Sequence, residues 1–232
     1  MSAGVRTVLR GFGQLLITAG VVLLLFCVYE LEVTTLYTNQ KQHTLNRQLT
    51  DTWQRAHPSA PNASAPAGPV LAAFTPGEGI ARIYLPTLGK DQVHVVVEGV
   101  SHEDLKTGPG HYPGTALPGE IGNVVISGHR TTYGQPLNRV DELRTGAPIV
   151  LETADAFFTY DVTGETVVEP TAVGVILPVP NQPGVAPSER LLTLTTCNPK
   201  YSAQQRLIVR ARLVSRLTKT AGAVPPALQP AR

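Results

Sequence analysis

The stretch "LLTLTTCNPKYSAQQRLIVRARLV", residues 191–214, decides the fold of this chain. It holds two runs in which side chains alternate between apolar and polar, the pattern of a β-strand with one face toward a core. The inward residues are Leu192, Leu194, Leu207, Val209, Ala211 and Leu213, and the outward residues are Thr193, Thr195, Cys197, Arg206, Ile208, Arg210 and Arg212. We expect the two runs to form an antiparallel pair. Arg206 then begins the second strand close to where Cys197 ends the first.

The chain before this pair is also rich in short β-type runs with Pro and Gly at most of their junctions. Counting the pair, nine runs are visible: 81–86, 93–99, 123–128, 148–153, 156–164, 166–170, 173–178, 191–196 and 206–214. Helical periodicity appears only at 101–108 and 136–144. A length of 232 residues allows one ordinary core plus an appendage. The pattern therefore predicts a mostly β fold, with eight or nine strands in one closed or sandwiched domain.

The N-terminal segment has the composition of a membrane span. Residues 11–29 carry no charge, and a helix of that length reaches roughly 28 Å, close to the hydrocarbon core of a bilayer. Arg6 and Arg10 precede it and Glu30 and Glu32 follow it, so the positive-inside rule keeps residues 1–10 in the cytoplasm and the rest outside. A cleaved signal peptide is the alternative. It lacks support because no small-residue cleavage site follows the apolar run.

The remaining segments differ in composition. Leu45, Leu49 and Trp53 recur at four-residue spacing, which predicts a weakly amphipathic juxtamembrane helix that lifts the domain from the membrane as a stalk. The expected division is a stalk at 30–56, a Pro/Ala-rich linker at 57–78, the β-domain at 79–217 and a disordered tail at 218–232.

Composition excludes several classes of function. Apolar residues make up 42% and charged residues 16% of the chain, and the formal charge is +2. No basic run interleaves with aromatic residues, so no nucleic-acid partner is expected. The scattered histidines and two cysteines offer no paired ligand spacing, so neither a metal nor another cofactor is expected. Cys27 lies in the predicted span and cannot reach Cys197, which leaves Cys197 without a disulfide partner.

A thiol at a strand end is a candidate nucleophile, but a catalytic cysteine needs a basic or cationic neighbour. His129, in "NVVISGHRTTYG", follows a strand end and Gly128, which gives it a position like that of Cys197. His111, in "GPGHYPGTALPGE", lies on a Gly/Pro-rich loop suited to lining a groove. One Cys and one His at strand ends are a weak signal without further support.

At these residues the chain resembles the sortases, and most of all the class E sortases of high-GC Gram-positive bacteria. "TLTTC" at 193–197 is similar to the T-L-x-T-C signature of that family, and Arg206 falls where its arginine is expected. "GHRTTYG" resembles the histidine segment, and "GPGHYPGTALPGE" the stretch before it. The similarity covers roughly residues 78–215.

The resemblance implies a closed sortase-type β-barrel of about eight strands and a cysteine transpeptidase on the outer face of the cell membrane. Cys197 would attack the Thr–Gly bond of a C-terminal sorting signal, Leu-Ala-x-Thr-Gly for class E, on a surface-protein substrate. His129 would act as general acid and base, and a peptidoglycan precursor would supply the acceptor amine. Arg206 and the backbone N–H of Thr196 would stabilise the oxyanion. The remaining substrate-binding candidates are Thr195, His111 and Tyr112, whose ring would favour Ala at the second position of the signal.

Two other functions remain open at this point. An L,D-transpeptidase is also a β-rich, membrane-anchored cell-wall enzyme with a Cys/His pair, but it would not require Arg206. A tethered, non-catalytic binding barrel would keep Cys197 buried and inert.

Overall fold

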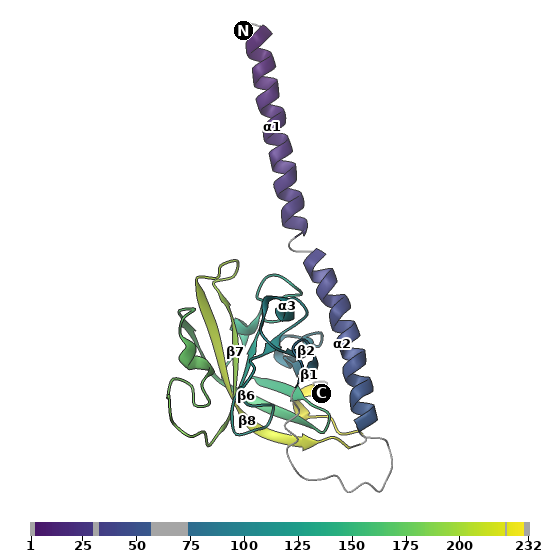
Figure 1. Cartoon of the computed structure of the whole chain (residues 1–232), viewed down its shortest axis with the longest axis vertical. Coiled ribbons are helices and arrows are strands. Elements are labelled where there is room, and N and C mark those ends of the chain that lie inside the picture. The colour runs from purple at the N-terminus through teal and green to yellow at the C-terminus, as the bar shows by residue number, and fades with distance from the viewer. Residues whose placement is uncertain (1–2, 30–32, 57–73, 221, 230–232) are drawn as a thin grey trace.

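The computed structural model describes residues 3–29, 33–56, 74–220 and 222–229, in which two helices precede a β-barrel (Figure 1). The first helix, α1, runs from Ala3 to Val28 and contains most of the span predicted at 11–29. From Gly4 to Val28 it is long and apolar enough to cross a membrane, and none of it is buried against the rest of the chain. Its exposed apolar side chains are explained if lipid surrounds them.

Eight strands close into a barrel in the order β1-β2-β3-β4-β7-β8-β6-β5. Their bounds are β1 Gly79–Tyr84, β2 Val93–Glu98, β3 Gly110–His111, β4 Gly122–Ser127, β5 Pro148–Glu152, β6 Ala156–Val168, β7 Arg190–Asn198 and β8 Gln205–Thr218. β7 pairs parallel with β4 and antiparallel with β8. The expected pair at 191–214 and the closed barrel are therefore confirmed, with β7 between β4 and β8.

The barrel interior holds one core, to which the predicted inward residues belong. Leu192, Leu194, Leu207, Val209 and Ala211 are members of this buried cluster, and Leu213 packs against its edge. Ile208, expected to face outward into solvent, lies outside this cluster but is fully buried. The outer face of β8 is therefore partly covered by other segments.

Three predicted strand runs differ from the structure. Residues 156–164 and 166–170 belong largely to one strand, β6, because Gly164 marks a shift in pairing register with β8 and does not end the strand. The run at 173–178 is not a strand but contains a 3₁₀ helix, η4, Val173–Ile176, which Pro178 and Pro180 follow. β3 has only two residues, too few to give a periodic signal. The helical segments are confirmed at α3, His102–Leu105, and at a 3₁₀ helix, η3, Val140–Glu142.

The second helix, α2, Thr34–Ala56, was expected to be a stalk but lies along the barrel (Figure 1). The Gln42 amide nitrogen donates to the carbonyls of Val95, at 3.0 Å, and Thr107, at 2.8 Å. Its amide oxygen accepts from the N–H of Val95 at 2.7 Å. Because β3 pairs with β2 only at Val97 and Glu98, Gln42 satisfies backbone groups of β2 that no strand reaches.

The C-terminal half of α2 is held by a cluster of charged and aromatic residues. Arg82 of β1 donates to Asn46 Oδ1 at 2.6 Å and lies over the ring of Trp53 at 4.7 Å. It also pairs with Glu152 at 3.0 Å, and Lys219 pairs with the same carboxylate at 2.6 Å. Burial alone would raise the pKa of Glu152, but hydrogen bonds from Lys219 and Tyr84 and the charge of Arg82 bring it below its usual value.

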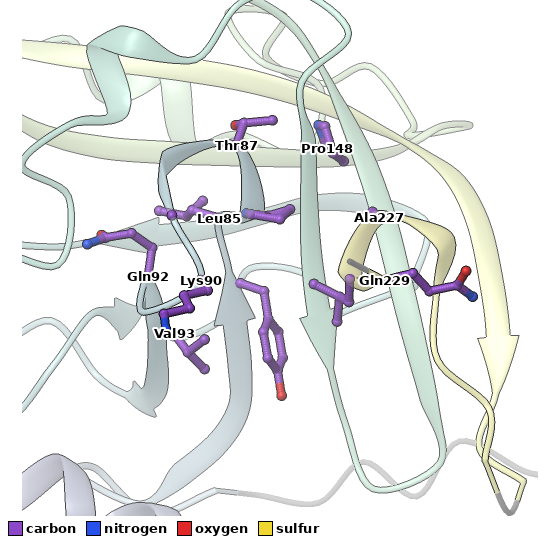
Figure 2. A pocket seen from close by; sticks show the side chains of 12 residues that line it. Leu85, Thr87, Lys90, Gln92, Val93, Pro148, Ala227 and Gln229 are labelled. Atoms are coloured by element: carbon purple, nitrogen blue, oxygen red, sulfur yellow. The ribbon is translucent and has the colours of Figure 1, made fainter. Parts of the chain in front are cut away.

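The two segments that flank the barrel also pack against it. Residues 57–73 of the predicted linker lie outside the described residues, but Phe74 packs against the core, so the domain begins before residue 79. The tail, predicted to be disordered from 218, instead continues β8 to Thr218 and forms a 3₁₀ helix at Pro226–Leu228. Pro225 is buried, and Figure 2 shows Ala227 and Gln229 beside β5. Apolar contact with the barrel explains why this Pro-rich segment is ordered.

Candidate active site

Cys197 and Arg206 face each other across the β7–β8 pair. They are register partners, one residue from the end of each strand. Directly opposed residues of antiparallel strands have Cα atoms about 4.5 to 5.5 Å apart and side chains on the same face. Leu207, next to Arg206, belongs to the core, so this shared face is the outer face of the barrel. Both side chains are partly buried, and Cys197 is a free thiol.

His129 is fixed beside β7 by hydrogen bonds on both sides of the preceding glycine. β4 ends at Ser127, which pairs with Thr195. The Gly128 N–H donates to the Thr195 carbonyl at 3.2 Å, and the Thr196 hydroxyl donates to the Gly128 carbonyl at 2.8 Å. A Cβ on Gly128 would lie 2.9 Å from Leu137 Cγ, so only glycine fits here. The imidazole is thereby brought to the same end of the sheet as Cys197.

The environment of His129 favours its neutral form. Burial lowers the pKa of His129, and the nearby His102 lowers it further. The imidazole ring lies against the ring of Tyr133, with centroids 4.9 Å apart. Nε2 of His129 is buried and finds no hydrogen-bond partner among the residues that the structure describes. An imidazole nitrogen without a hydrogen-bond partner keeps its capacity to donate or accept a proton.

Arg130 is a functional candidate that sequence analysis missed. It is 4% exposed, and its Nη1 donates to the Cys197 carbonyl at 3.1 Å and to Asn198 Oδ1 at 2.8 Å. Its Nη2 pairs with Asp141 at 2.9 Å. Arg130 therefore fixes the backbone on which the thiol is carried. Its position next to His129 was the only available signal, since nothing local shows that this charge is buried.

The β6–β7 connection covers part of the outer face of the sheet at the end of β7 away from Cys197. The Asn123 side chain on β4 donates to the carbonyls of Val175 and Leu177, both at 3.1 Å, and accepts from the Thr193 hydroxyl at 2.8 Å. Thr193 is buried although it points away from the core. The connection thus covers the outer face of the sheet at the start of β7.

The other predicted site residues differ in their burial. His111 is 2% exposed, and its Nδ1 lies 2.7 Å from Glu98 Oε2. Its Nε2 lies 2.9 Å from Thr115 Oγ1 and 3.1 Å from the Ala116 carbonyl, so the expected groove-lining role does not fit. The side chains of Thr195 and Thr196 are also buried, which leaves them little surface for a ligand. Tyr112 is only partly buried.

The arrangement of His, Cys, Asp and Glu side chains bears on metal binding. Within the described ranges, no group of three or more of these residues could hold a metal ion.

A cavity of about 610 Å³ lies away from these residues (Figure 2). It is formed by the β1–β2 loop, Pro148 and the C-terminal segment, as shown by the side chains of Leu85, Lys90, Gln92, Val93 and Gln229 in Figure 2. Neither Cys197, His129 nor Arg206 lines it. We place the candidate active site at Cys197, where the thiol, the imidazole and the guanidinium meet, and not at this cavity.

Comparison with known proteins decides the family. The sortase domain family model matches residues 83–214, more than half of the chain and the whole of the site described above. The chain belongs to the sortase family. Members of this family are cysteine transpeptidases.

The similar proteins include sortases E. Sortase SrtE1 of Streptomyces coelicolor is 34% identical over 92% of this chain, which spans 59% of the length of SrtE1. The solved structure of sortase E from Streptomyces avermitilis is 43% identical, with a TM-score of 0.60, and the match covers 67% of this chain and all of that one. The crystal structure of sortase E1 from Streptomyces coelicolor, which holds a tripeptide in its active site, is 37% identical, with a TM-score of 0.61 over 68% of this chain and all of that one.

Proposed function

We propose that this sortase is a membrane-anchored cysteine transpeptidase. Its substrate is a surface protein that ends in a Leu-Ala-x-Thr-Gly sorting signal, and it joins the Thr carbonyl to the amine of a peptidoglycan precursor. The observation that carries the proposal is the register pairing of Cys197 with Arg206, beside the segment that holds His129. A thiol, a proton carrier and a fixed cation at one strand end are the groups that acyl transfer needs.

In the first half-reaction, Cys197 Sγ bonds to the Thr carbonyl carbon and the thiol proton passes to His129. The carbonyl electron pair moves onto oxygen, where Arg206 and the Thr196 N–H are the proposed donors. One such donor is worth about 2.7 to 4 kcal/mol in a well-formed oxyanion hole. When the C–N bond breaks, the glycine amine takes the proton from His129 and leaves. The Thr residue remains as a thioester on Cys197.

In the second half-reaction, an acceptor amine attacks the thioester carbonyl carbon. His129 takes a proton from the attacking nitrogen and returns it to sulfur as the C–S bond breaks. Burial favours neutral His129, the form that this step requires. The thiol is then regenerated and an amide joins the two substrates.

Tyr112 is the proposed determinant of the Ala preference in the signal. It follows β3, its N–H donates to the Val125 carbonyl at 2.9 Å, and its side chain is partly buried. A ring fixed beside the substrate would exclude side chains larger than Ala, which is worth about 1 to 3 kcal/mol per methylene-scale misfit. Tyr112→Ala should therefore raise kcat/KM for a Leu-Pro-x-Thr-Gly peptide relative to the Leu-Ala peptide. Unchanged selectivity would remove Tyr112 from the proposal.

We further propose that α1 is retained as the anchor, with residues 1–10 in the cytoplasm and the barrel outside the cell. Support comes from Arg6 and Arg10 on one side of the span and from Glu30 and Glu32 on the other. Protease added outside intact cells should digest the barrel and spare the N-terminus. Digestion of the barrel only after the cells are lysed would show that the orientation is the opposite of the one proposed.

The test of the proposed reaction uses the full chain in detergent, a Leu-Ala-x-Thr-Gly or Leu-Pro-x-Thr-Gly peptide and an amine acceptor. We expect amide product between Thr and the acceptor, with the Leu-Ala peptide preferred. Arg206→Ala should lower product formation by about 100-fold or more, whereas an L,D-transpeptidase would be largely unaffected. Full activity of Arg206→Ala, or no product from the unmodified chain, would contradict the proposal.

A further inference from the structure

The loop after His129 has a left-handed backbone at three successive residues. The φ angles are 51° at Tyr133, 73° at Gly134 and 51° at Gln135. For a residue other than glycine, such a conformation costs about 1 to 3 kcal/mol and persists only where surrounding contacts hold it. Tyr133 has such contacts on two sides.

On one side, Tyr133 lies against the imidazole of His129. Their ring centroids are 4.9 Å apart and the planes are tilted by 37°. The ring of His102 approaches the same tyrosine edge-on, with centroids 6.3 Å apart. A ring packed on His129 restricts the side-chain torsions of the imidazole, so the direction of its nitrogen atoms depends on where Tyr133 lies.

On the other side, the loop meets the first turns of α2. A Cβ on Gly134 would lie 3.1 Å from Thr38 Cγ2, so the loop backbone approaches the helix closely. Thr38 is 3% exposed, and its hydroxyl donates to the Lys106 carbonyl at 2.7 Å. A cavity of about 300 Å³ at this junction is lined by Tyr29, Val33, Thr34, Tyr37, Lys106 and Tyr133. The helix therefore borders the loop that carries Tyr133.

We propose that Tyr133 is a positioning residue for His129 and that α2 holds Tyr133 in place, so that the juxtamembrane helix belongs to the catalytic unit. This inference rests on the proposed role of His129. The helix is fixed one turn further along, where Gln42 bonds to Val95 and Thr107. Gln42 lies one helical turn beyond Thr38 and does not touch the loop that carries Tyr133, so we expect its loss to reach His129 through the position of the helix.

The test compares variants of the full chain in detergent, with the Leu-Ala-x-Thr-Gly peptide and an amine acceptor. Tyr133→Ala removes the ring, and Gln42→Ala releases the helix. For each we expect kcat to fall by about 10- to 100-fold, the size of effect that a misplaced catalytic group produces. KM should change by less than about threefold, because the substrate surface is untouched. Tyr133→Phe, which keeps the ring, should restore kcat to within about threefold.

The matched control for Gln42→Ala is Gln48→Ala, an exposed glutamine on the same helix, which should keep full activity. The double variant Gln42→Ala with Tyr133→Ala should be no slower than Tyr133→Ala alone, because both changes act through one ring. Independent effects would instead multiply. Multiplied losses, or either single variant with kcat within about threefold of the unmodified chain, would overturn the proposal.

Thermal unfolding separates misfolding from misalignment. If Gln42→Ala fails to fold, Thr38→Ala replaces it, since this change removes the hydroxyl that contacts the Thr34 and Lys106 carbonyls and the methyl group that lies beside Gly134. The same loss of kcat is expected of it, and unchanged kcat would overturn the proposal. An inactive unmodified chain would instead contradict the transpeptidase function itself, so the two failures are distinguishable.

Discussion

At the level of single residues, a buried charge touches the backbone of Cys197, the proposed nucleophile. Arg130 contacts the Cys197 carbonyl and Asn198 with one guanidinium nitrogen and Asp141 with another. A lysine ammonium is a single point and cannot span these partners. The pairing of Cys197 with Arg206 followed from strand alternation, but the burial of Arg130 did not, because it results from contacts with residues 67 and 68 positions away.

Arg130→Lys should therefore impair catalysis although it keeps the charge. We expect kcat/KM to fall by about 10- to 100-fold as the end of β7 shifts. The matched control is Arg139→Lys, since Arg139 forms an exposed pair with Glu142 at 2.6 Å and contacts no part of the site. Steady-state kinetics on the sorting peptide measures both. Equal activity of the two variants would show that Arg130 does not position Cys197.

His94 on β2 should make the fold sensitive to acid. Burial lowers its pKa from 6.5 to about 4. Between these values the unfolded chain binds a proton that the folded chain does not, so this stability is fully present above pH 6.5 and is lost as the pH falls toward 4. At pH 4.5 the loss from this residue is about 2 to 3 kcal/mol.

Urea unfolding at pH 7 and at pH 4.5 measures this effect. The free energy of unfolding should fall more steeply with acid in the unmodified chain than in His94→Gln, which has no imidazole to protonate. Identical decreases in the two proteins would show that His94 is not protonated on unfolding.

At the scale of elements, local patterns predicted most of the strands, but they divided β6 into two runs and missed β3. β7 and β8 alternate regularly and were predicted together with their pairing. β3 is two residues long, and the apolar run at 173–178 packs over β4 through Asn123. Helix α2 was predicted as a helix, but its packing against the open edge of β2 was not predicted. The edge of β2 is open because β3 is too short to cover it, and no local pattern in the sequence indicates this.

Loss of Gln42 should destabilise the barrel as well as slow catalysis. Gln42→Ala leaves the N–H and carbonyl of Val95 without their side-chain partner, at a cost of about 1 to 3 kcal/mol for each group that water cannot reach. Chemical denaturation should show the decrease, with Gln48→Ala as the control. A free energy of unfolding equal to that of the control would mean that α2 does not complete the sheet.

At the scale of the whole molecule, the catalytic domain is larger than the barrel. Helix α2 covers β1 and β2, and the C-terminal segment covers part of β5 (Figures 1 and 2). The resemblance to sortases predicted the barrel, which is confirmed, and three site residues, which stay predictions, but composition suggested a stalk and a disordered tail. Both segments are polar or Pro-rich, and they become ordered through contacts that only the closed barrel provides.

The most direct test of this account is the intact mass of the full chain, quenched with acid soon after mixing with the Leu-Ala-x-Thr-Gly peptide and no acceptor. The account predicts a thioester adduct of the peptide, cleaved after Thr, on Cys197 of the unmodified chain. Cys27 should stay unmodified, and Cys197→Ala should carry no adduct. The absence of an adduct, or one on any other residue, would contradict the assignment of Cys197 as the nucleophile.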